Sequence, residues 1–162
     1  MKKSVFSIAI IFSLFLCNLN LYAQDAKANF AGVWTINTAK STQGDGNFRG
    51  PKQLTFNQDG NNITVTRVST GRDGSDNTST ATITLDGKES VSTTERGTSK
   101  SVATWSADGQ TLTISRTMIR SGSTMEMKSS EVMSMIGATL TITSVSQSPN
   151  GERKVTLVYD KK

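Results

Sequence analysis

Three segments of this chain carry nearly the same alternating pattern of apolar and hydroxyl-bearing residues. They span residues 62–67 (NITVTR), 111–116 (TLTISR) and 139–144 (TLTITS). A period of two is typical of a β-strand that buries one face, because successive side chains point to opposite faces of a sheet. Threonine suits such a strand, since its branched Cβ packs well on a pleated surface. The repeat therefore predicts a structure built from half-buried strands.

Short turn sequences separate the alternating segments. Asp59-Gly60, Asp86-Gly87, Asp108-Gly109 and Asn150-Gly151 each stand between two such runs, and these dipeptides are strong hairpin signals. After the N-terminal apolar stretch, no long segment shows the three-to-four spacing of an amphipathic helix. We expect strands at residues 30–37, 52–57, 61–69, 79–85, 89–95, 99–106, 110–120, 123–134, 138–145 and 153–159.

A meander of hairpins with one apolar face must hide that face from water. Closing the sheet on itself hides the face and also removes exposed strand edges, whereas a flat sheet would leave the face wet. The sequence therefore predicts an all-β fold, an antiparallel meander closed into an up-and-down barrel of about 8–10 strands. A two-sheet sandwich is the alternative.

The N-terminus has the features of a secretory signal peptide. It begins Met1-Lys2-Lys3, continues with an apolar stretch over residues 5–16, and reaches Ala23 before a polar segment. The apolar stretch is short for a membrane span, although a charged anchor helix is the alternative. We expect a signal peptide over residues 1–23, a linker over 24–29, and one barrel domain over 30–162. The protein would then be periplasmic or secreted.

Cys17, the only cysteine of the chain, lies inside this N-terminal segment. A lipoprotein would use such a cysteine as its lipidated first residue, normally directly after a small residue. Here Leu16 precedes it, so lipid anchoring through Cys17 is the minor alternative. After cleavage the mature chain would have no disulfide, and its core alone would have to stabilise it.

Composition excludes several kinds of active site. The chain has no histidine, so Ser-His-Asp and Cys-His arrangements and imidazole metal sites are ruled out. Losing Lys2 and Lys3 would lower the formal net charge from +5 to +3, because 18 basic residues less two would face 13 acidic ones. The basic residues are scattered and form no nucleic-acid-binding stripe. We expect a monomer that is not an enzyme, with no cofactor, no metal and no nucleic-acid partner.

Two arginines fall on the apolar face of the repeated strands. Arg67 is in phase with Ile63 and Val65, and Arg116 ends the second copy of the repeat in the same way. If that face points inward, both guanidinium groups enter the barrel. A buried unpaired arginine costs several kcal/mol, so each needs a carboxylate, water or an anionic ligand. Glu95 is the candidate carboxylate; arginines that reach solvent at strand ends are the plainer interpretation.

Large apolar side chains are candidates for the walls of a ligand pocket. Met118 continues the face of Arg116, while Trp105 and Phe56 lie on predicted strands. Aromatic and methionine side chains line many pockets, and they fill cores at least as often. The sequence therefore offers Arg67, Arg116, Glu95, Trp105, Phe56 and Met118 as a candidate binding set.

The first predicted strand carries a motif of its own. Gly32-Val33-Trp34, within FAGVW, resembles the Gly-x-Trp opening of lipocalin-like barrels. With its repeated Asp-Gly hairpins, the mature chain resembles exported bacterial lipocalin-like proteins, although it lacks a cysteine pair and has more than eight predicted strands. The resemblance implies that Gly32 and Trp34 close the barrel floor beside a basic residue of the last strand, either Arg153 or Lys154. It also implies a barrel that holds a small molecule.

Three functions remain open at this point. The first is an exported binding protein for a small hydrophobic or amphipathic ligand with an anionic end. The second is a structural or interaction protein of the cell envelope, with a barrel filled by side chains and recognition through its loops. The third is an enzyme with Glu95 as a base beside an arginine. A cavity at Arg67 and Arg116 would favour the first.

Overall fold

The computed structural model describes residues 26–42, 50–148 and 151–162; the predicted signal peptide, Cys17 and the cleavage point at Ala23 lie outside them. In this described part of the chain, no helix is long and apolar enough to cross a membrane. The described residues form ten strands: β1 (Gly32–Ile36), β2 (Gln53–Asp59), β3 (Asn62–Thr70), β4 (Asp76–Thr84), β5 (Glu89–Thr94), β6 (Gly97–Trp105), β7 (Thr111–Arg120), β8 (Glu126–Ile136), β9 (Thr139–Ser148) and β10 (Gly151–Lys161).

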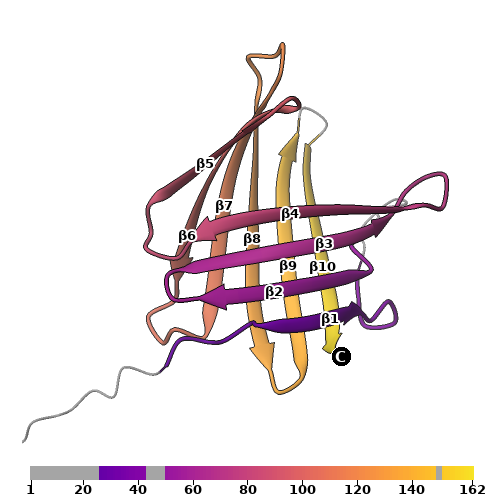
Figure 1. Cartoon of the computed structure of the whole chain (residues 1–162), viewed down its shortest axis with the longest axis vertical. Coiled ribbons are helices and arrows are strands. Elements are labelled where there is room, and N and C mark those ends of the chain that lie inside the picture. The colour runs from indigo at the N-terminus through magenta and orange to yellow at the C-terminus, as the bar shows by residue number, and fades with distance from the viewer. Residues whose placement is uncertain (1–25, 43–49, 149–150) are drawn as a thin grey trace, which may run out of the picture.

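The strands form one antiparallel sheet that bends round on itself. Consecutive strands pair with each other along the chain, except β4 with β5, and β1 also pairs with β10, which gives the order β4-β3-β2-β1-β10-β9-β8-β7-β6-β5. In Figure 1, β1–β4 cross in front of the upright strands β8–β10, so the two halves of the sheet face each other. Only β4 and β5, the two ends of this order, lack a shared ladder. The predicted all-β up-and-down barrel is confirmed, with one seam left open.

The apolar phase of the repeated strands faces the interior, as expected. Ile63, Leu112 and Leu140 begin the apolar phase of the three copies, and each is at most 1% exposed. The threonines in the opposite phase lie on the outer surface, where Thr64 and Thr82 share a hydrogen bond of 2.8 Å between neighbouring strands. The alternation therefore places hydroxyl groups outside and aliphatic groups inside on these strands.

The Asp-Gly turns use the carboxylate to hold the backbone. The Asp108 carboxylate accepts hydrogen bonds from the hydroxyl of Ser106 and, at 3.0 Å, from the Gln110 amide. These bonds favour the charged form and lower the pKa of the Asp108 carboxyl below its usual value of 3.8. Gly109 follows with φ of +70°, a left-handed conformation that glycine adopts without strain.

Residues ahead of β1 cross one end of the barrel and close it. Ala28 donates a backbone hydrogen bond of 2.9 Å to Gly109, and the Phe30 amide donates to the Gln58 side chain at 3.2 Å. Phe30 is fully buried and Ala28 is 8% exposed. Within the described part of the predicted linker, Ala28 is therefore packed into the core, and Phe30, the first residue of the predicted barrel domain, fills that end beside it.

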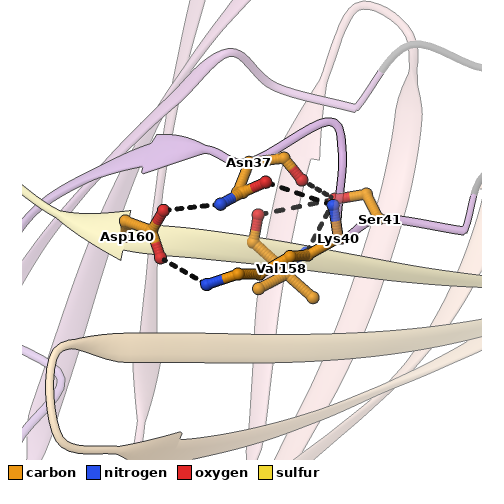
Figure 2. Close-up of polar contacts among 5 residues, drawn as sticks. All are labelled: Asn37, Lys40, Ser41, Val158 and Asp160. Carbon is orange, nitrogen blue, oxygen red and sulfur yellow. Dashed lines mark hydrogen bonds and ion pairs between the residues drawn. The ribbon is translucent and has the colours of Figure 1, made fainter.

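The segment after β1 runs along the edge of β10 that β1 also pairs with. Figure 2 shows Asn37, which donates to Asp160 at 2.7 Å, and Ser41, whose hydroxyl accepts the Val158 amide at 2.9 Å. Thr42 then exchanges backbone hydrogen bonds with Thr156. This segment continues the pairing of β10 where the short β1 ends, so the barrel wall stays closed on that side.

Candidate functional site: an interior cavity

The closed end of the barrel is organised around Trp34. Its indole nitrogen donates a hydrogen bond of 2.9 Å to the Phe30 carbonyl, and the side chain is fully buried. The Lys161 ammonium lies 5.3 Å from the Trp34 ring centroid, within cation–π range. Gly32 has φ of +131°, and a Cβ there would meet the Lys161 side chain at 3.0 Å. Gly32 and Trp34 thus lie together at the end that the resemblance assigned to them.

The basic residue beside Trp34 is Lys161, which corrects the expectation of Arg153 or Lys154. The β1–β10 register sets Lys161 directly opposite Trp34. Arg153 and Lys154 pair with Ser146 and Val145 of β9, near the other end of the same strand. The prediction ended the last strand at residue 159, two residues before the strand reaches Trp34.

Trp105 and Phe56 belong to the filled end of the barrel. The Trp105 ring stacks on Phe30 with centroids 5.9 Å apart, and Phe56 packs against Phe30 at 6.4 Å. Neither residue lines the larger interior cavity, although Phe56 lines a smaller cavity that Arg67 also borders.

Beyond this filled end, a cavity of about 470 Å³ lies where β4 faces β5 and β6 across the open seam. Arg67, Arg116 and Met118 line it together, from β3 and β7. The structure therefore brings three of the candidate residues to one cavity, and its volume is typical of a small-molecule site. The remaining lining residues are mostly small and hydroxyl-bearing: Thr80, Ala81, Thr82, Ile83, Ser90, Val91, Ser92, Ser99 and Ser101.

Arg116 is the cation of this cavity for which the described residues supply no carboxylate partner. Its Nε donates a hydrogen bond of 3.3 Å to the hydroxyl of Ser101, a residue only 7% exposed. Among the residues described, none of the ion pairs includes Arg116. A partly buried guanidinium with a single neutral acceptor retains hydrogen-bonding capacity for an anion.

Arg67 is paired with a carboxylate that the sequence analysis missed. Its Nη2 lies 3.3 Å from Oε2 of Glu131, with side-chain exposures of 21% and 22%. Arg67 is on β3 and Glu131 on β8, and the strands β2, β1, β10 and β9 separate them along the sheet. The ion pair therefore spans the interior rather than joining neighbours along the wall.

The ion pair also borders a second, smaller cavity. This cavity of about 70 Å³ is lined by Arg67, Glu131 and Tyr159, with apolar side chains around them. Burial raises the pKa of the Tyr159 hydroxyl above its ordinary value of 10.0, while the Arg67 charge lowers it and the Glu131 charge raises it. Tyr159 is therefore neutral at physiological pH, and Glu131 is the anion that faces Arg67.

Glu95 does not pair with either arginine, which corrects that part of the prediction. It follows the end of β5 in an exposed turn. On β5, the inward-facing residues are Ser90 and Ser92, which line the larger cavity. A signal for Glu131 was present in the sequence, because residue parity puts it on the same face of its strand as the apolar Met133. In the structure Met133 is 1% exposed.

Comparison with known proteins supports the fold. No family model and no curated protein matches the chain. The zebrafish ileal bile acid-binding protein, solved in complex with cholic acid, superposes with a TM-score of 0.54 at 17% identity, covering 82% of this chain and 98% of that one. An abundant heat soluble (SAHS) protein from Ramazzottius varieornatus superposes with a TM-score of 0.56 at 12% identity, covering 85% of this chain and 98% of that one. At these identities the likeness establishes a lipocalin-like barrel fold.

Proposed function

We propose that this protein is an exported carrier that binds a small amphipathic molecule with an anionic end inside its barrel. The observation that carries this proposal is the cavity of about 470 Å³ with two inward arginines, one of them without a carboxylate partner among the described residues. The ligand's anionic group would bind Arg116 and Arg67, and its apolar part would pack on Met118, Ala81 and Ile83.

The physical basis of the proposal is the chemistry of the side chains that line the cavity. A guanidinium group that is partly removed from water gains from a charge-assisted hydrogen bond, which is stronger than a bond to a neutral hydroxyl. Apolar side chains on the same wall gain from covering hydrocarbon, at about 25 cal/mol per Å². The zebrafish protein that shares the fold is complexed with cholic acid, a small acid, which agrees with this ligand class.

Export is the second part of the proposal and rests on the N-terminal sequence. Met1-Lys2-Lys3, the apolar stretch over residues 5–16 and Ala23 form a complete signal-peptide pattern. Intact-mass measurement of the protein recovered from its native host should then give a chain that starts at Gln24. A mass that includes Met1 would contradict export by cleavage, and an added lipid on Cys17 would indicate anchoring instead.

The binding proposal is tested with three probes that share one alkyl chain. Isothermal titration should show that decyl sulfate binds more tightly than decanol, and that decyltrimethylammonium binds least, because only the sulfate satisfies Arg116. Arg116→Gln should raise the dissociation constant of decyl sulfate by roughly tenfold, because one charge-assisted hydrogen bond is lost. Binding of decanol should change little.

The matched control is Arg72→Gln. Arg72 lies in the exposed turn between β3 and β4 and lines neither cavity. Both variants remove one positive charge, so a difference between them reports the position of the charge. Equal affinities for all three probes, or equal losses in the two variants, would overturn the proposal. The envelope alternative, in which loops act and the interior binds nothing, would then be favoured.

A further inference from the structure

Three charged side chains line the two interior cavities, and they come from three different strands. Arg67 on β3 borders both cavities, Arg116 on β7 borders the larger, and Glu131 on β8 borders the smaller. Within these two linings the formal charge is therefore one positive unit. Glu131 lies opposite Ile114 on β7, two residues before Arg116 on the same inward face.

Glu131 thus lies close to both arginines but pairs with only one of them. Its carboxylate is 3.3 Å from Arg67, while its position diagonal to Arg116 corresponds to a separation of about 7–8 Å between backbones. At that separation charges still interact appreciably in a partly desolvated interior. An anion that binds between the arginines must therefore experience the negative charge of Glu131.

We propose that Glu131 sets the charge of the ligand, so that the cavity selects a singly charged anionic amphiphile over a doubly charged one. This inference rests on the proposed binding function. The cost of removing an ion from water rises with the square of its charge, whereas its attraction to the site rises only in proportion to the charge. With one net positive charge, the site compensates a monoanion better than a dianion.

Removing the charge of Glu131 gives a sharp expectation. The site would then carry two net positive charges, and the added attraction would be twice as large for a dianion as for a monoanion. The ratio of the two affinities should therefore shift toward the dianion. If the Arg67–Glu131 pair were purely structural, neutralising Glu131 would change both affinities by the same factor and leave their ratio unchanged.

The test compares decyl sulfate with decyl phosphate at pH 8, below their micelle concentrations. The two share chain length and tetrahedral oxyanion shape, but the phosphate carries close to two charges because its second pKa is about 6. Isothermal titration of the purified protein gives both dissociation constants. Glu131→Gln should shift their ratio toward the phosphate by roughly tenfold. Arg67→Gln combined with Glu131→Gln restores one net charge and should restore the original ratio.

Two further variants complete the test, one as a second way to remove the charge of Glu131 and one as a surface control. Glu131→Met also removes the charge and matches Met133, its in-phase neighbour on β8, so it decides the question if the glutamine variant does not fold. Glu126→Gln removes an exposed carboxylate on the same strand, which pairs with Lys128 at 3.6 Å. The ratio of the two dissociation constants in this variant should equal that of the unmodified protein. An unchanged ratio in the folded neutral variants overturns the role of Glu131 alone. Failure of the unmodified protein to bind either probe overturns the proposed function as well.

Discussion

Phe30 lies at the centre of the contacts that fill one end of the barrel. Its side chain is fully buried, stacks on Trp105 and packs against Phe56, while its carbonyl accepts the Trp34 indole. Phe30 thus contacts both tryptophans of the chain, Trp105 through its ring and Trp34 through its backbone carbonyl. The same side chain removes Trp105 and Phe56 from any ligand-binding role in the larger cavity.

Truncation of Phe30 should therefore be costly. Phe30→Ala is expected to lower the free energy of unfolding by about 3–5 kcal/mol, because it leaves a cavity at the closed end and removes the stacking on Trp105. Urea titration followed by tryptophan fluorescence measures this loss. Ile136→Ala, at a side chain 85% exposed, should change stability by less than about 0.5 kcal/mol. Similar losses in the two variants would show that Phe30 does not anchor the core.

At the scale of single elements, the turns carry the carboxylates whose ionisation favours the folded state. The pKa values of Asp73, Asp86 and Asp108 are all lowered by hydrogen bonds within their own turns. The Asp86 carboxylate, for example, accepts the Lys88 amide at 2.9 Å. These aspartates lie in turns at the protein surface, so each shapes a turn and none is poised for chemistry in the interior.

The lowered pKa values fix the sign of a pH effect. A carboxyl whose pKa is depressed by folding contributes stability above its ordinary pKa of 3.8, and this stability is lost as the pH falls through the lowered value. The urea concentration at the midpoint of unfolding should decrease as the pH is lowered from about 4 to about 2. Asp108→Asn retains an acceptor oxygen for the turn but cannot titrate, so its midpoint should fall less steeply. Parallel curves for the variant and the unmodified protein would contradict this assignment.

At the scale of the whole molecule, the barrel is closed everywhere except along the seam between β4 and β5. These strands end the sheet order, while β9 and β10 have a paired neighbour on each side. The larger cavity is lined from both sides of this seam, by Ala81 and Ile83 on β4 and by Ser90 and Ser92 on β5. The hollow part of the barrel therefore coincides with its least bonded wall.

Hydrogen exchange should reproduce this uneven bonding. Backbone amides of β4 that point toward the seam have no partner strand and should exchange fastest among the strands, whereas amides of β9 should be the most protected. Exchange followed by NMR resolves the two sets. A bound anionic amphiphile should slow exchange on β4 and β5 more than on β9, because it contacts those strands. Uniform protection around the barrel would contradict the open seam.

The period-two alternation and the Asp-Gly turns predicted most of the fold before any tertiary contact was known. All ten strands overlap their predicted positions, and the inward phase of residues such as Ile63 and Leu112 follows from local geometry alone. Arg67, Arg116 and Met118 were placed on one cavity by the same phase argument. Side-chain direction along a strand depends only on residue parity, so the sequence determines it by itself.

Only the tertiary structure decided which inward residues meet. Arg67 pairs with Glu131 rather than Glu95, and Lys161 rather than Arg153 faces Trp34, because these contacts depend on register and on curvature across the whole barrel. Phe30 fills one end because the chain ahead of β1 turns across the opening. Parity fixes the direction of a side chain but not the residue opposite it, since a partner across a closed barrel is set by every pairing in between.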